Sequence, residues 1–140
     1  MAHEIMSVKL CELDDRVARL HSRLRLTETA DAGTLDWEIA EQERQCAETA
    51  LTLAQRLAHS KGAVARELSE TYEKMESQLQ LMASSLGPAV QQSEAPADEQ
   101  AFLAEYALDF ALLAVERALL LSMQAIYAQQ ILETEERNKR

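Results

Sequence analysis

The chain has 140 residues, a net charge of −10 at neutral pH and 47% hydrophobic residues. This length suits a single domain with one core, and the hydrophobic fraction excludes an intrinsically disordered chain. Glycine, proline and aromatic residues are few, whereas alanine, leucine, glutamate and glutamine are frequent. Such a composition favours helices, and no segment alternates β-branched or aromatic residues with polar ones as a strand would. We therefore expect an all-α fold.

The charge and the cysteines exclude several classes of function. An acidic surface repels phosphate backbones, so we expect no nucleic-acid partner. Cys11 and Cys46 are far apart in the sequence, which is typical of reduced thiols inside the cell. The N-terminal residues lack the features of a signal peptide, and the longest uncharged run, 118–132, is shorter than the roughly 20 residues of a membrane span. These features predict a cytoplasmic protein without a membrane partner.

The first expected helix has apolar residues at spacings of three and four. These residues are Met6, Leu10, Leu13, Val17, Leu20 and Leu24. The spacing is that of a heptad, which places all six on one face against a neighbouring helix. The segment 27–33 breaks this pattern, and Gly33 with Thr34 predicts a turn followed by an N-cap.

Two further helices are expected between residues 35 and 86. The inner face of the helix at about 35–60 carries Leu35, Ile39, Cys46, Ala50, Leu53 and Leu57, and that of the next helix carries Val64, Leu68, Tyr72, Met75, Leu79 and Met82. We expect Gly62 to separate them as a left-handed helix-ending residue. The alternative is one continuous helix, because a single glycine inside a helix costs only about 1 kcal/mol.

A linker at about 87–97 precedes the last helix. Gly87 and Pro88 are expected to stop the third helix, and small polar residues follow. The last helix should begin between Ser93 and Asp98 and extend for roughly 35 residues, or about 50 Å. It ends in a polar tail, 133–140, that we expect to be frayed.

The last helix is apolar over most of its circumference, unlike the other three. A helix of this kind is buried on more than one side, so it needs more partners than its neighbours in a small bundle supply. We therefore predict self-association of the chain, with a dimer favoured, through Phe102, Tyr106, Phe110, Leu113, Leu120 and Tyr127. The alternative is that the neighbouring helices wrap this helix more fully.

Three carboxylates interrupt the apolar surface of the last helix. Glu105, Asp109 and Glu116 are four and seven residues apart, so they share one face. They mark the one solvated stripe of the helix; the alternative is a buried functional site with raised pKa values.

Candidate chemistry is limited to histidines and glutamate clusters. None of His3, His21 and His59 has a glutamate three residues before it or a second histidine four residues away, which argues against a histidine-containing metal site. Glu38 and Glu41, with Glu67 and Glu70, form Glu-x-x-Glu pairs on two helices. This spacing resembles that of the magnesium-binding motifs of all-α nucleotide pyrophosphohydrolases, although the doubled glutamate at the head of the first motif is missing. The alternative is a solvated helix face with local basic partners.

We therefore predict an all-α four-helix bundle of antiparallel helices that forms a single domain over residues 1–140. Its expected role is that of a non-catalytic interaction or scaffold module without a cofactor, which self-associates and can bind another protein. Two alternatives remain: a magnesium-dependent enzyme that acts on nucleotides, and a binder of an apolar small molecule between the helices.

Overall fold

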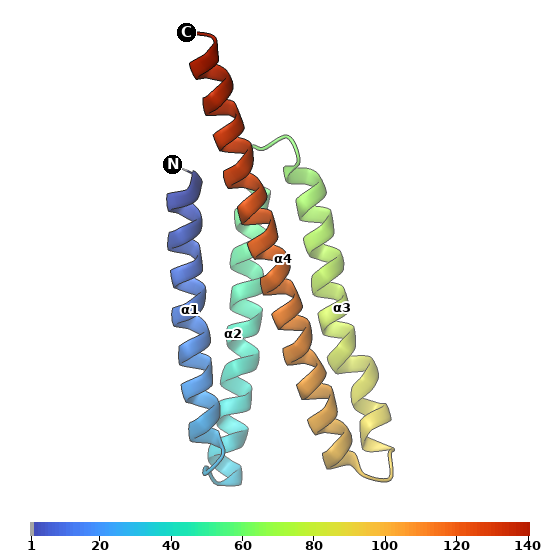
Figure 1. The fold of residues 1–140 in the computed structure, drawn as a ribbon. Coiled ribbons are helices and arrows are strands. Elements are labelled where there is room, and N and C mark those ends of the chain that lie inside the picture. Colours follow the sequence, from blue (N-terminus) through green and yellow to red (C-terminus); the bar gives the residue numbers. More distant parts are fainter. Residues whose placement is uncertain (1) are drawn as a thin grey trace. The chain divides into compact units, whose positions relative to one another are not determined.

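The computed structural model describes residues 2–140, apart from the side chains of residues 2, 3 and 83. The chain forms four helices: α1 (Ala2–Thr27), α2 (Ala32–Ala58), α3 (Ala65–Gln91) and α4 (Pro96–Asn138) (Figure 1). There is no strand in this part of the chain. The predicted all-α fold class with four helices, the last of them the longest, is confirmed.

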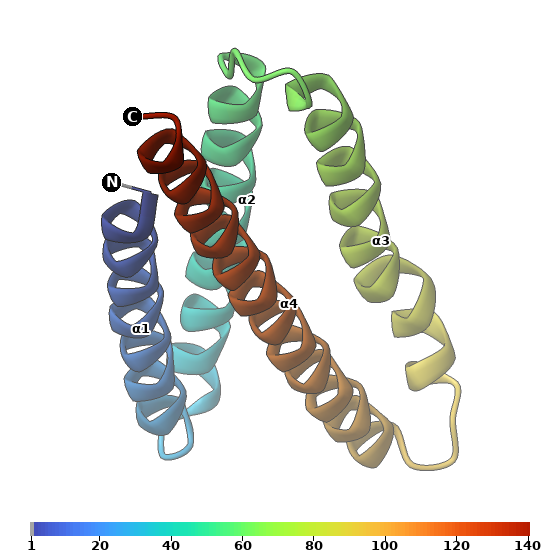
Figure 2. The ribbon, with the colours of Figure 1, turned by 45° about the horizontal axis from the view of Figure 1, so that its top comes forward.

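The chain divides into two compact units. One consists of Met1–Leu26 with Ala101–Arg140, and the other of Thr27–Gln100. In the first unit α1 and α4 run in opposite directions, and in the second α2 and α3 form an antiparallel hairpin (Figures 1 and 2). The closure of all four helices into a single domain stays a prediction.

The turn between α1 and α2 differs from the expectation in its capping residue. Asp31, not Thr34, is the N-cap of α2, and its Oδ1 accepts a hydrogen bond from the Thr34 backbone N–H at 2.7 Å. An N-cap carboxylate satisfies an amide that has no carbonyl partner in the first turn. Donation from Thr34 to the charged carboxylate lowers the pKa of Asp31. Both candidate residues are good caps, and the helix simply begins three positions earlier.

The lowered pKa of Asp31 predicts acid sensitivity at the start of α2. A carboxyl group with a depressed pKa in the folded chain stabilises the fold above its unfolded pKa of about 3.9 and loses this effect as the pH falls through the folded value. Asp31→Asn keeps an acceptor but does not ionise. We expect its melting temperature, followed by circular dichroism, to fall less than that of the wild type between pH 5 and pH 2. Equal losses in both proteins would show that the cap does not contribute.

The break between α2 and α3 is confirmed, but its geometry is not the expected one. α2 ends at Ala58 and α3 begins at Ala65. No glycine in the described chain has a positive φ, so the left-handed role assigned to Gly62 is wrong. The helix instead ends on His59, whose backbone N–H donates to Gln55 O at 3.2 Å and whose Nδ1 lies 2.7 Å from the same oxygen. A terminal carbonyl is therefore satisfied without a left-handed residue.

A hydrogen bond joins α2 to α3. Tyr72 Oη donates to the Ala50 carbonyl at 2.7 Å, and both residues belong to the predicted inner faces of their helices. The loss of water around the phenol and the negative charge of Glu76 both raise the pKa of Tyr72. The contact therefore agrees with the faces predicted for this hairpin at these two positions.

The expected stop at Gly87 and Pro88 is wrong. α3 continues through both residues to Gln91, with Pro88 inside the helix, and only residues 92–95 link it to α4. The last turn is held by Gln92 N–H, which donates to Pro88 O at 3.1 Å. In this turn Val90 is 7% exposed, and burial of its side chain offsets part of the cost of the internal proline.

The ends of α4 also differ from the expectation. Pro96 is its first residue, a position where a missing N–H costs nothing because that amide has no partner within the helix. The predicted frayed tail is helical as far as Asn138, and Lys139 N–H donates to Glu135 O at 3.1 Å.

Candidate interaction surface

The candidate functional site is the surface of α4. With 43 residues, this helix is about 64 Å long at a rise of 1.5 Å per residue. None of its residues is buried. Contiguous exposed apolar surface of this kind marks interaction sites on folded proteins.

The residues predicted to mediate self-association are all exposed. Their exposed fractions lie between 47% and 65% for Phe102, Tyr106, Phe110, Leu113, Leu120 and Tyr127. Each follows the one before it by three, four or seven residues, which places them along one side of the helix. Ile131, which is 41% exposed, follows Tyr127 by four residues and extends this row, although the prediction omitted it. We call these seven residues the apolar row.

The three carboxylates of α4 lie at the surface. Glu105, Asp109 and Glu116 are exposed, as the solvated stripe requires. Asp109 and Glu116 follow Phe102 at intervals of seven residues, so the carboxylates flank the apolar row on the same side of the helix. A partner that covers the row therefore lies next to these carboxylates.

The N-terminal helix carries a second apolar surface in the same unit. Leu10, Val17 and Leu24 of the predicted heptad are 47%, 53% and 56% exposed. Both helices of this unit therefore present apolar side chains to the surroundings.

The glutamate clusters of α2 and α3 are not assembled into a metal site. In the described part of the chain, no group of three or more His, Cys, Asp or Glu side chains is placed to hold a metal ion. Glu67 and Glu70 are exposed on α3, and Glu38 and Glu41 are half-buried on α2. Of the histidines, His21 lies on α1, His59 caps α2, and the side chain of His3 lies outside the described residues.

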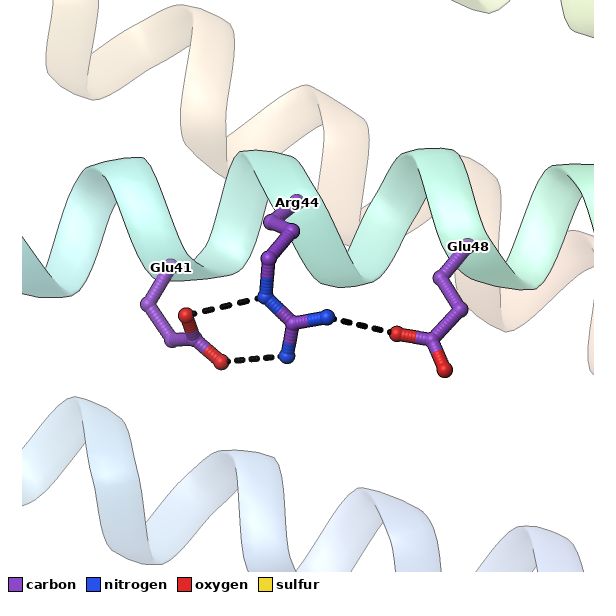
Figure 3. Close-up of polar contacts among 3 residues, drawn as sticks. All are labelled: Glu41, Arg44 and Glu48. Carbon is purple, nitrogen blue, oxygen red and sulfur yellow. Dashed lines mark hydrogen bonds and ion pairs between the residues drawn. The ribbon is translucent and has the colours of Figure 1, made fainter.

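One glutamate of these clusters is engaged by an arginine. Arg44 Nη2 lies 2.6 Å from Glu41 Oε1 and its Nε donates to Glu41 Oε2 at 3.0 Å, while Nη1 reaches Glu48 Oε2 at 2.8 Å (Figure 3). The hydrogen bonds to Glu41, the negative charge of that residue and the contact with Glu48 raise the pKa of Arg44. Such a bidentate pair on a helix surface is the local basic partner that the solvated-face interpretation expects.

By length and composition alone, α4 is the one helix of residues 2–140 that could cross a membrane. Apolar helices that pack against other helices have the same property, so this feature is weak evidence. Glu116 and Arg117 lie at the middle of the helix, where each charged side chain would cost about 2.5–3.5 kcal/mol on insertion.

Both cysteines are free and exposed. The Sγ of Cys46 accepts from Gln42 Nε2 at 3.8 Å within the same helix.

No protein family, curated protein or solved structure matches this chain.

Proposed function

We propose that this protein is a non-catalytic interaction or scaffold module that self-associates through α4. The observation that carries the proposal is the apolar row, whose seven large side chains are each at least 41% exposed. Single exposed apolar residues are ordinary on protein surfaces, but a continuous row of them along one helix is not.

The physical reason is the free energy of removing these side chains from water. Full burial of one large apolar side chain contributes about 1.5–3 kcal/mol. About half of each side chain is already covered in the single chain, so fourteen side chains from two copies contribute about 10–20 kcal/mol. This is comparable to the entropy lost on association, which is about 4–15 kcal/mol.

The chemistry of the surface supports the remaining parts of the proposal. The net charge of −10 disfavours nucleic acid as a partner. The charged pair at the middle of α4 disfavours a membrane and is compatible with a cytoplasmic protein. The glutamate clusters supply no observation that favours nucleotide hydrolysis, since Glu41 is held by Arg44 and Glu67 and Glu70 lie on an exposed face.

Sedimentation equilibrium over about 1–100 µM tests the proposal. From a chain mass of 15.7 kDa, we expect a species of twice that mass at the upper concentrations. A mass of 15.7 kDa throughout this range would refute self-association. Flotation with phosphatidylcholine vesicles tests whether α4 instead binds a membrane. We expect the protein to stay in the aqueous fraction.

A further inference from the structure

The apolar row contains a symmetric element. Tyr106, Leu113, Leu120 and Tyr127 are spaced by seven residues, so they occupy equivalent positions along one side of α4. The order Tyr, Leu, Leu, Tyr reads the same in both directions, and its midpoint lies between Glu116 and Arg117. All four side chains are at least 47% exposed.

This symmetry is compatible with two directions of pairing between copies. An antiparallel partner centred on the midpoint places Tyr106 opposite Tyr127 of the second copy, and Leu113 opposite Leu120. A parallel partner in register places each residue opposite its own equivalent. Because both arrangements match large side chains with large side chains, the row alone does not choose between them.

The charges of α4 distinguish the antiparallel from the parallel arrangement. Residues 96–116 carry five carboxylates and no basic residue, namely Asp98, Glu99, Glu105, Asp109 and Glu116. Residues 117–140 carry four basic and three acidic residues, a net charge of +1. A parallel dimer would place every charged residue of α4 beside its own equivalent. The antiparallel dimer instead places Glu116 of each copy beside Arg117 of the other, and only the ends, where Asp98 faces Glu135, bring like charges together. Packed helices are about 8–10 Å apart, which is comparable to the screening length of about 8 Å at physiological salt, so mainly the charges that face each other across the interface interact.

We infer that the partner of α4 is a second copy of this chain in an antiparallel arrangement, with the two-fold axis between residues 116 and 117. This inference rests on the proposed self-association and adds its direction and register. The interface is isologous, so the same row is contributed by both copies. The opposed helix dipoles favour the same direction.

Distances between spin labels test the direction. The background is Cys11→Ser with Cys46→Ser, which removes the two exposed thiols. Single cysteines are then introduced at Ala101 or Ala118, both exposed and both off the apolar row. In the antiparallel dimer Ala101 lies opposite Leu132, so two labels at residue 101 are separated by about 47 Å along the axis, and two labels at residue 118 by about 5 Å.

With the width of two packed helices added, we expect label separations of about 50 Å at residue 101 and about 20–25 Å at residue 118. Dilution with unlabelled protein should remove both signals, which shows that they arise between copies. Circular dichroism and the mass of each labelled variant show that it is folded and associated.

Each other outcome has a distinct meaning. Separations of about 20–25 Å at both sites would establish a parallel dimer, and a long separation at residue 118 would establish another register. Either result overturns this inference and leaves self-association standing. A monomeric mass without any separation between copies would overturn the proposed function itself.

Discussion

Replacement of Leu113 and Leu120 by aspartate should convert the associated protein into a monomer. Both residues lie at the centre of the apolar row, and each is about half exposed in the single chain. The variant removes four leucine side chains from a dimer at about 1.5 kcal/mol each, a total of about 6 kcal/mol. The dissociation constant should therefore rise by about four orders of magnitude, which light scattering after size exclusion would report as half the mass.

The matched control carries the same change at two other exposed leucines. Leu51 and Leu81 are 60% and 48% exposed, and neither belongs to the inner faces predicted for α2 and α3. We expect Leu51→Asp with Leu81→Asp to keep the wild-type mass. If the α4 variant retained its helical circular dichroism and still formed dimers, the apolar row would not be the interface.

Replacement of Pro88 by alanine should stabilise the protein. Pro88 lies inside α3, where it cannot donate to the carbonyl of Ser84 and its ring crowds that carbonyl. An internal proline costs about 3 kcal/mol of helix stability relative to alanine. Proline also lowers the conformational entropy of the unfolded chain, which offsets up to about 1 kcal/mol of that cost. We expect a net increase of about 2 kcal/mol in the free energy of unfolding, measured by urea titration.

Two neighbouring positions provide the comparison. Gly87→Ala should add about 1 kcal/mol, because a Cβ there meets no atom within 4 Å and φ is not positive. Pro96→Ala, at the first position of α4, should change stability by less than about 0.5 kcal/mol. A loss of stability in Pro88→Ala would mean that the chain requires the proline at this turn.

Much of the fold could be predicted because the spacing of apolar residues identifies the face on which a helix packs. The contact between Tyr72 and Ala50 joins two residues that spacing alone places on inner faces. The ends of the elements were harder to predict. Gly62 and Pro88 are helix-breaking residues, yet Gly62 adopts no left-handed conformation and Pro88 is helical. Local preferences of about 1–3 kcal/mol are comparable to what capping and side-chain burial at a helix end contribute.

The candidate site was predictable for a different reason. The last helix has more apolar residues than one buried face needs, and this excess is visible in the amino-acid sequence itself. Ile131 lies before the polar tail, 133–140, and extends the row because it follows Tyr127 by four residues. The identity of the partner does not follow from hydrophobicity, since lipid and protein both cover apolar side chains, and only the charges distinguish between them.

Native mass spectrometry of the untagged protein, followed by the denatured mass of the same sample, tests self-association most directly. We predict a dimer of twice the 15.7 kDa chain mass, with no mass beyond that of the two chains. A monomer alone at micromolar concentration would contradict the account. A reproducible adduct on the monomer would likewise contradict it and would favour a small apolar ligand as the partner of α4.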